Sequence, residues 1–229
     1  MQKPALKRRI ANMLISRGRT AFLLKYFKNG NAILDCGCGN NCSHIIKSIC
    51  PSSHYTGIDV CDYDQSLHGS ADKYIAAKPE TFTDKIMEMP DSFDIVISSH
   101  NLEHCDYREK TLTAICSALR AGGFLYLSFP AENSVNFPCR KGTLNYYDDK
   151  THKDLPPDYK KTIEMLKANN MEIIYAVKSH KPVLFFILGA IIEPVSGMLK
   201  RLLSPWALFG RATWSYYGFE SIIWAKKKF

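Results

Sequence analysis

Short apolar segments alternate with amphipathic helical patterns along most of this chain, and several of the apolar segments end in an acid or a glycine. Apolar runs of four to eight residues indicate buried strands, and apolar residues three or four positions apart indicate helices. Strands that alternate with helices predict an α/β fold with a mostly parallel sheet and helices on both faces. The expected strands are residues 32–34, 55–60, 74–77, 92–99, 124–129, 171–177 and 218–226, and the expected helices are residues 43–50, 81–89, 109–119 and 157–169.

Residues able to carry chemistry follow directly after these strands. Asp35 and the residues up to Asn40 follow the first strand, Asp59 ends the second, and residues 100–104 follow the fourth. In open parallel sheets, ligands bind beyond the carboxyl ends of the strands, where the strand order reverses. These three segments are therefore expected to converge on one cleft.

A glycine turn lies between the first strand and the first helix of the sheet. Gly37 and Gly39 let the backbone turn sharply and leave bare main chain for a ligand. Asp59 stands 20 residues after Gly39, where a carboxylate can accept both hydroxyls of a ribose. A dinucleotide fingerprint would place a third glycine where Cys42 stands, and Asp35 would repel a pyrophosphate. The turn therefore favours a ribose-containing ligand with a cationic end, and it disfavours a nicotinamide-dependent oxidoreductase.

Four segments in order resemble the motifs of class I S-adenosylmethionine-dependent methyltransferases, of the small-molecule type associated with cell-surface polysaccharide synthesis. They lie within residues 31–130. The segments are Ile33-Leu34-Asp35-Cys36-Gly37-Cys38-Gly39, Tyr55-Thr56-Gly57-Ile58-Asp59-Val60, residues 93–104 (FDIVISSHNLEH) and residues 119–128 (LRAGGFLYLS). The resemblance implies a Rossmann-like seven-stranded sheet whose last two strands form an antiparallel edge hairpin.

The resemblance also implies a cofactor, S-adenosylmethionine, and residues that hold it. Asp35, Gly37 and Gly39 would hold its methionine end, and Asp59 would hold the ribose hydroxyls. The adenine contact normally follows the third strand, where this chain departs from the common pattern and offers Glu80 as a candidate. Three residues after the fourth strand would line the cofactor near the reacting methyl: His100, Asn101 and Leu102.

Methyl transfer to a hydroxyl also needs a base that takes the proton. The loop over residues 131–158 contains His152 beside Asp148 and Asp149, and we assign His152 as the base. His104 is the alternative base, on the main fold. The family's members that methylate base amino groups carry an Asn/Asp-Pro-Pro-aromatic motif after the fourth strand. This chain lacks that motif, which favours a small-molecule hydroxyl, such as that of a sugar or a lipid-linked glycan precursor.

We expect one methyltransferase domain over residues 1–229, with three segments added to the core of residues 31–130. Residues 1–30 form a basic helical arm, residues 131–158 form a substrate loop, and residues 181–217 form an apolar helical insertion between the last two strands. The insertion is interpreted as a helical hairpin packed on the sheet edge, where it can form a homodimer interface. The alternative is a helix on a membrane surface for a lipid-linked substrate.

Composition limits the remaining choices. Thirty basic and 22 acidic residues give a net charge of +8, which permits anionic partners without selecting one, and the motifs do not favour nucleic acid. No export signal follows the basic start, so the eight cysteines are expected as free thiols in the cytoplasm, with the inner membrane face as a peripheral site. Cys36, Cys38 and Cys42 lack the paired spacing of a zinc site, and no metal is expected. A cofactor-binding but inactive partner subunit remains an alternative to the enzyme.

Overall fold

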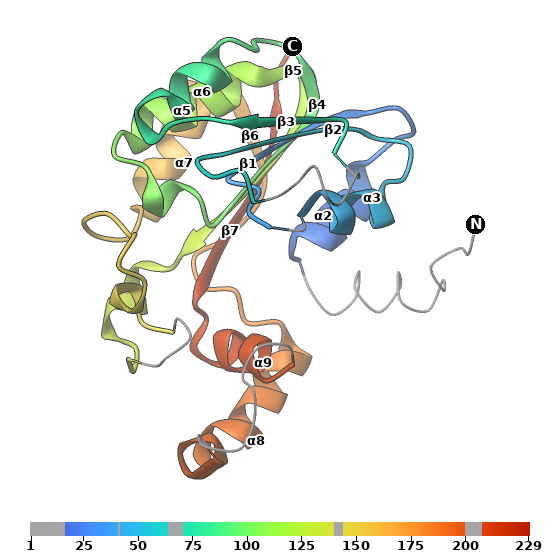
Figure 1. Ribbon diagram of the computed structural model, residues 1–229. Helices are drawn as coiled ribbons and strands as arrows, with labels where there is room; N and C mark the ends of the chain where they lie inside the picture. Colours follow the sequence, from blue (N-terminus) through green and yellow to red (C-terminus); the bar gives the residue numbers. More distant parts are fainter. Residues whose placement is uncertain (1–16, 41, 64–70, 140–143, 200–207) are drawn as a thin grey trace.

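A computed structural model describes residues 17–40, 42–63, 71–139, 144–199 and 208–229. Within these ranges one sheet runs through the molecule, with helices packed on both of its faces (Figure 1). Most of the expected N-terminal arm lies outside the described residues. The strands are β1 (Ala32–Cys36), β2 (His54–Asp59), β3 (Lys73–Ala76), β4 (Phe93–Ser99), β5 (Leu119–Pro130), β6 (Met171–Val177) and β7 (Glu220–Lys227).

Helices connect the strands in the order that the sequence predicts. Short 3₁₀ helices occupy the turns and the loop after β5: η1 (Pro79–Thr81), η2 (Leu102–His104), η3 (Glu132–Asn136) and η4 (Tyr146–Asp148). The α-helices are α2 (Arg19–Tyr26), α3 (Cys42–Ile49), α5 (Phe82–Met87), α6 (Arg108–Ala118), α7 (Tyr159–Ala168), α8 (Val183–Leu199) and α9 (Leu208–Tyr217).

The seven strands lie in the order β3-β2-β1-β4-β5-β7-β6. The pairs from β3 to β5 are parallel, and β7 is antiparallel to both β5 and β6. The predicted Rossmann-like sheet with an antiparallel edge hairpin is therefore confirmed. The strand order reverses between β1 and β4, so the crevice for a ligand lies beyond the carboxyl ends of these two strands.

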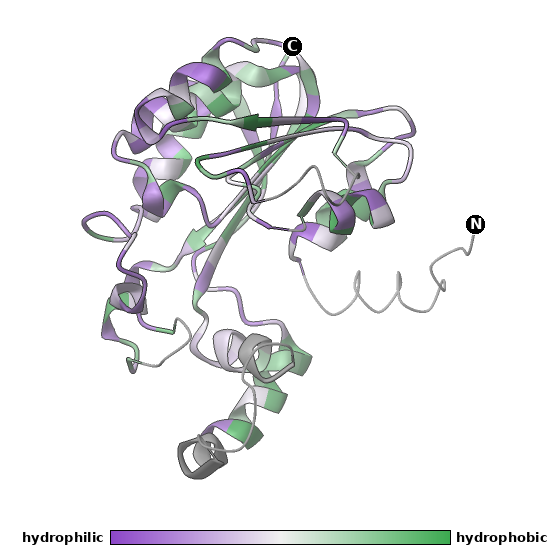
Figure 2. Cartoon of the chain, in the orientation of Figure 1, coloured by the Kyte–Doolittle hydropathy of each residue, from purple (hydrophilic) through white to green (hydrophobic). Residues whose placement is uncertain are grey.

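Two hydrophobic clusters cover the two faces of the sheet. One contains Leu112 and Ile115 of α6 with Leu166 of α7, and the other contains Phe22 of α2 with Ile46 of α3. In β1, β4, β5 and β7, alternate residues belong to opposite clusters, as the two-residue period of a strand requires. Figure 2 shows that apolar residues concentrate along the strands and the inward sides of these helices.

Strand β5 begins earlier than predicted. The sequence predicts a helix that ends at residue 119 and a strand that starts at residue 124, but residues 119–123 lie inside β5. The pairing with β4 shifts register between Phe93 and Ile95, so the run forms an irregularity in the strand rather than a break. A Cβ at Gly123 would lie 2.9 Å from the carbonyl oxygen of Arg120, which explains why glycine stands there.

Helices α8 and α9 lie between β6 and β7 in the chain and extend beyond the end of the sheet (Figure 1). The two helices pack closely at Gly189, where an added Cβ would lie 2.3 Å from the carbonyl oxygen of Ala212. The other side of α8 leaves a row of apolar side chains more than half exposed: Val183, Leu184, Ile187 and Ile191. Among the described residues, no helix is both long and apolar enough to cross a membrane.

Candidate active site

The glycine turn after β1 adopts a backbone conformation that side chains disfavour. Gly37 and Gly39 have φ angles of +69° and +59°. A Cβ at Gly37 would lie 2.6 Å from Oδ1 of Asn101, so the turn touches the segment that follows β4. At Gly39 no described heavy atom lies within 4 Å of the position of a Cβ. The predicted meeting of these two strand ends is therefore present, with space beside Gly39.

Asp59 is tied to the glycine turn. Its Oδ2 accepts the backbone N–H of Gly39 at 2.8 Å, and its Oδ1 accepts that of Val60 at 2.6 Å. A carboxylate offers about four acceptor positions, so each oxygen keeps capacity for a ligand hydroxyl. The side chain is 7% exposed at the end of β2. The structure thus gives Gly39 a role that the sequence did not indicate, because its N–H fixes the carboxylate assigned to the ribose.

The Asp35 side chain is buried at the end of β1. It is 1% exposed, the Tyr55 hydroxyl donates to its Oδ2 at 3.0 Å, and the Arg19 guanidinium lies 4.0 Å from the same oxygen. Burial raises the pKa of Asp35 from 3.8 to about 6, Arg19 and Tyr55 oppose this rise, and Asp59 adds to it. Neither Arg19 nor Tyr55 was expected from the sequence.

The raised pKa of Asp35 links folding to pH. In the unfolded chain the carboxyl ionises near its usual value, and in the folded chain it ionises near 6. Its contribution to stability is therefore complete below about pH 4 and is lost as the pH rises through about 6. A pKa of about 6 in place of 3.8 corresponds to about 3 kcal/mol.

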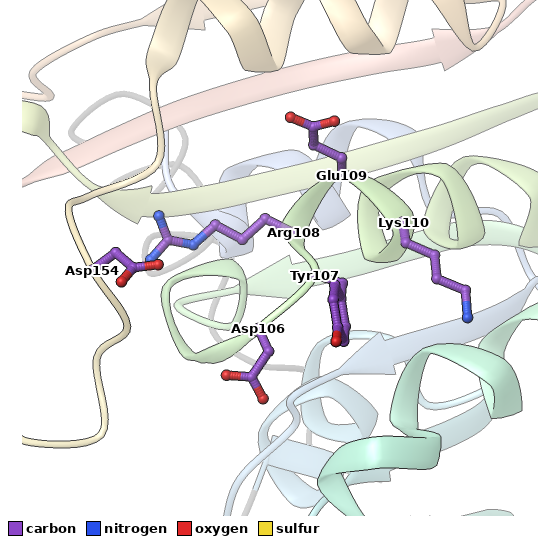
Figure 3. A pocket seen from close by; sticks show the side chains of 6 residues that line it. All are labelled: Asp106, Tyr107, Arg108, Glu109, Lys110 and Asp154. Atoms are coloured by element: carbon purple, nitrogen blue, oxygen red, sulfur yellow. The ribbon is translucent and has the colours of Figure 1, made fainter.

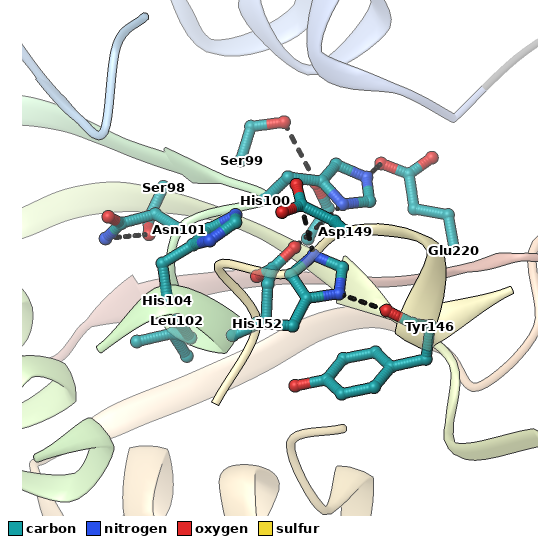
Figure 4. A network of polar contacts seen from close by, with 12 residues as sticks. Ser98, Ser99, His100, Asn101, Leu102, His104, Tyr146, Asp149, His152 and Glu220 are labelled. Carbon is teal, nitrogen blue, oxygen red and sulfur yellow. Dashed lines mark hydrogen bonds and ion pairs between the residues drawn. The ribbon is translucent and has the colours of Figure 1, made fainter. Parts of the chain in front are cut away.

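His100 is enclosed by two carboxylates (Figure 4). Its Nδ1 bonds with Glu103 Oε1 at 3.0 Å, and its Nε2 lies 3.4 Å from Glu220 Oε1. Burial alone would lower the pKa of His100, but the two carboxylates outweigh burial and raise it to about 10. Its ring lies against those of Trp214 and Phe219. The imidazolium therefore links the end of β4 to the start of β7, and Glu220 is a partner that local sequence patterns did not reveal.

The side chains of Asn101 and Leu102, the two residues after His100, lie in different surroundings. Asn101 is 7% exposed, and its Nδ2 donates to Ser98 Oγ at 3.3 Å, beside Gly37. Leu102 is 2% exposed and belongs to the core cluster with Leu112. Asn101 thus lies at the glycine turn, while Leu102 packs into the core. The adenine candidate, Glu80, is exposed in η1 after β3.

The loop after β5 brings His152 to His104. Their ring centroids lie 4.8 Å apart (Figure 4). His152 Nδ1 donates to the backbone carbonyl of Tyr146 at 2.6 Å, and the Tyr146 ring stacks on the imidazole. Burial lowers the pKa of His152, which favours the neutral imidazole. The two base candidates that the sequence offered as alternatives are therefore neighbours.

Arg108 of α6 holds this loop in place, a role that the sequence analysis missed. Its guanidinium donates to the carbonyl oxygens of Glu103, Lys153 and Leu155, and to the Tyr146 hydroxyl. A planar guanidinium has five N–H donors in a fixed fork and can hold several acceptors at once. Lys153 and Leu155 lie 45 and 47 residues after Arg108 in the chain, so no local sequence motif could indicate these hydrogen bonds.

A surface pocket lies at the start of α6, apart from the predicted cofactor residues (Figure 3). Six residues line it: Asp106, Tyr107, Arg108, Glu109, Lys110 and Asp154. None of them is a residue that the sequence analysis assigned to the site.

The cysteines of the glycine turn do not form a metal cluster among the described residues. The group whose spacing suits a metal consists of Glu103, His104 and His152, and Cys42 accepts a hydrogen bond from Arg19.

The residues at the end of β1 and β2 suit S-adenosylmethionine. The cofactor combines a cationic end with a ribose. Asp35 offers a carboxylate for the cationic end, and Asp59 offers one for the ribose hydroxyls. The open space beside Gly39 would admit a ligand against the backbone, since a Cβ there meets no described atom. The geometry of the turn and the acids is thus consistent with the predicted cofactor.

Comparison with known families agrees with this geometry. Residues 7–173 match the family model described as a methyltransferase domain, which is more than half of the chain. The chain belongs to this family and is a class I S-adenosylmethionine-dependent methyltransferase, as predicted. No curated protein matches the chain.

Solved structures share the fold at low sequence identity. An S-adenosylmethionine-dependent methyltransferase from Archaeoglobus fulgidus is 17% identical, with 97% of this chain and all of that chain covered and a TM-score of 0.55. A Burkholderia thailandensis 1,6-didemethyltoxoflavin N1-methyltransferase with bound S-adenosylhomocysteine is 13% identical, covering 98% and 82%, with a TM-score of 0.56. The [4+2]-cyclase SpnF is 15% identical, covering 91% and 79%, also with a TM-score of 0.56. The fold therefore carries several chemistries, and the acceptor must be argued from the site.

Proposed function

We propose that the protein transfers a methyl group from S-adenosylmethionine to a hydroxyl of a small molecule, with a sugar or glycan precursor as the acceptor class. The observation that carries the proposal is the pair of imidazoles from His104, which follows β4, and His152, in the loop after β5, whose ring centroids lie 4.8 Å apart. A neutral hydroxyl scarcely ionises at neutral pH, so its proton must be removed as the bond to the methyl carbon forms.

S-adenosylmethionine supplies a methyl group on a sulfonium, which is already an activated leaving group. The protein's part is alignment, which can contribute on the order of 7–11 kcal/mol in the best cases. Asp59 and the glycine turn hold one partner, and Asn101 lies between the turn and the end of β4. The remaining task, deprotonation of the acceptor, falls to His152 and His104.

The loop beside His152 supports a polar acceptor. Tyr147 is 57% exposed, and Asp149 and Lys150 lie on the same short segment. Exposed aromatic rings with an apolar body and a polar end suit partly wet interfaces. Carboxylates accept hydrogen bonds from hydroxyls. These groups favour a hydroxylated ligand over an apolar one.

Calorimetric titration of the protein with S-adenosylmethionine and with NAD tests the cofactor part. We expect binding of S-adenosylmethionine alone, and a loss of about 1.5–3 kcal/mol of binding free energy in Asp59→Ala, because a charge-assisted acceptor is removed. Tight NAD binding without sulfonium binding would exclude the proposal. An unchanged dissociation constant in folded Asp59→Ala would exclude the ribose assignment.

Turnover with candidate sugar acceptors tests the hydroxyl part. His152→Ala should lower turnover by roughly 10²–10⁴-fold, the usual contribution of acid–base catalysis, and leave the affinity for S-adenosylmethionine nearly unchanged. His104→Ala is the comparison. If His104→Ala abolishes turnover and His152→Ala does not, deprotonation depends on the main fold rather than on the loop.

A further inference from the structure

Three side chains that can ligate a metal lie together beside the cofactor residues. Glu103 and His104 come from η2 after β4, and His152 comes from the loop after β5. One ligand atom from each lies within 4.8 Å of the other two. The sequence analysis expected no metal, because it examined only the cysteine cluster around the glycine turn.

The hydrogen bonds of both rings leave the same nitrogen available. His152 Nδ1 must carry its proton, because the Tyr146 carbonyl can only accept. The Thr151 hydroxyl donates its one proton to Asp149 Oδ1 at 2.6 Å, so His104 Nδ1 donates to that hydroxyl at 2.9 Å. In the neutral rings each Nε2 therefore keeps a lone pair, and that of His152 lies 3.9 Å from Asp149 Oδ2. Outer hydrogen bonds of this kind orient histidines that bind metals.

The carboxylate of Glu103 supplies the second, independent observation. Glu103 is fully buried, and its Oε1 bonds with His100 Nδ1. Its other oxygen, Oε2, is buried with no hydrogen-bond partner among the described residues. A buried, unsatisfied acceptor of this kind costs about 1–3 kcal/mol, and more when it is charged. A bound cation would satisfy it.

We propose that Glu103, His104 and His152 bind one divalent transition-metal cation. Two imidazole nitrogens and one carboxylate oxygen suit Zn²⁺ and similar ions and leave coordination positions open, whereas Mg²⁺ prefers oxygen ligands. Ligand atoms at about 2.0–2.2 Å from one ion lie at most about 4.4 Å apart. Tetrahedral coordination at these distances places ligand atoms about 3.3–3.6 Å apart, so the three ligand atoms, which lie within 4.8 Å of one another, must close by the order of 1 Å on binding.

The open positions give the cation a role, and this step rests on the proposed function. The acceptor hydroxyl binds through an oxygen lone pair, its acidity rises, and its proton passes to water. The oxygen then forms the bond to the methyl carbon while the carbon–sulfur bond breaks and its electron pair stays on sulfur. His152 thus serves deprotonation as a ligand, rather than as the destination of the proton.

The test uses the full chain, stripped of metal by a chelator and titrated with Co²⁺ or Zn²⁺. We expect one ion per chain and a visible Co²⁺ spectrum without thiolate ligands, because eight cysteines offer the competing explanation. His152→Ala and His104→Ala should weaken binding by more than the roughly 10–100-fold that loss of an outer-shell partner causes. His54→Ala, a change at an exposed histidine of β2, is the matched control and should bind as the wild type does.

Glu103→Gln should also weaken Co²⁺ binding, and circular dichroism shows whether this buried variant folds. If it does not fold, the two histidine variants decide the test. Equal Co²⁺ affinity in the wild type and both histidine variants, or a thiolate spectrum, would overturn the proposal. If Co²⁺ binds as expected but S-adenosylmethionine does not, the proposed function fails and the metal site stands. If the methyl donor binds and turnover survives chelation, the metal inference fails alone.

Discussion

A methyl group added at Gly37 tests the geometry of the cofactor turn directly. The φ angle of +69° costs a residue with a Cβ about 1–2 kcal/mol. The added atom would also lie 2.6 Å from Oδ1 and 2.7 Å from Cβ of Asn101, and crowding of that kind costs about 1–3 kcal/mol more. We therefore expect Gly37→Ala to lower the free energy of unfolding by about 2–5 kcal/mol.

Two other glycines provide matched controls. Gly30 and Gly39 have φ angles of +81° and +59°, and an added Cβ at either meets no described atom within 4 Å. Both substitutions should therefore cost only the conformational part, about 1–2 kcal/mol. Gly30 lies in the turn between α2 and β1, away from Asp59. Gly39→Ala should in addition crowd the cofactor and raise its dissociation constant roughly 10–100-fold, which corresponds to about 1–3 kcal/mol.

Urea denaturation followed by circular dichroism gives the unfolding free energies, and calorimetric titration with S-adenosylmethionine gives the affinities. If Gly37→Ala is no less stable than Gly30→Ala, then Asn101 does not crowd the turn and the juxtaposition of β1 and β4 described above is wrong. If Gly39→Ala binds the cofactor like Gly30→Ala, the cofactor does not lie against this turn.

Three further predictions follow from burial and charge. Asp35→Asn should gain about 3 kcal/mol of stability relative to the wild type between pH 4 and pH 7, because only the wild type has to bury an ionising carboxyl; parallel pH profiles by urea denaturation would contradict this. Arg108→Lys should speed proteolytic cleavage within residues 131–158, because an ammonium cannot replace the guanidinium fork; an unchanged cleavage rate would argue against its role. Ile187→Ser and Ile191→Ser should change the unfolding free energy by less than about 0.5 kcal/mol. A loss above 2 kcal/mol would mean that this face of α8 is covered.

The sheet could be predicted because its signals are local. The parallel strands are short apolar runs; β1 contains Asp35 and ends at Cys36, directly before Gly37, and β2 ends with Asp59. The exception is the start of β5, where glycines at 122 and 123 indicated a turn. Close backbone contact inside a sheet and a tight turn both call for glycine, so composition alone could not separate them.

The partners within the site could not be predicted in the same way. Glu220 lies 120 residues after His100, and Arg108 bonds to carbonyls 45 and 47 residues away. Tyr55 and Arg19 reach Asp35 from β2 and α2. Each contact depends on how the sheet brings distant segments together. The sequence identified the residues that needed partners, and only the fold identifies the partners.

His100 and His104 follow β4, and His152 lies in the loop after β5. The hydrogen bonds of these three histidines assign them different tasks. Both ring nitrogens of His100 face carboxylates, those of Glu103 and Glu220, so its ring is engaged on both sides. In His104 and His152 the Nδ1 atom donates outward, to a hydroxyl and to a carbonyl. A neutral imidazole held in this way presents Nε2 as a lone pair, which can take a proton or bind a cation. Reactivity toward the acceptor is therefore expected on the side of His104 and His152, while His100 orients Glu103 and ties β4 to β7.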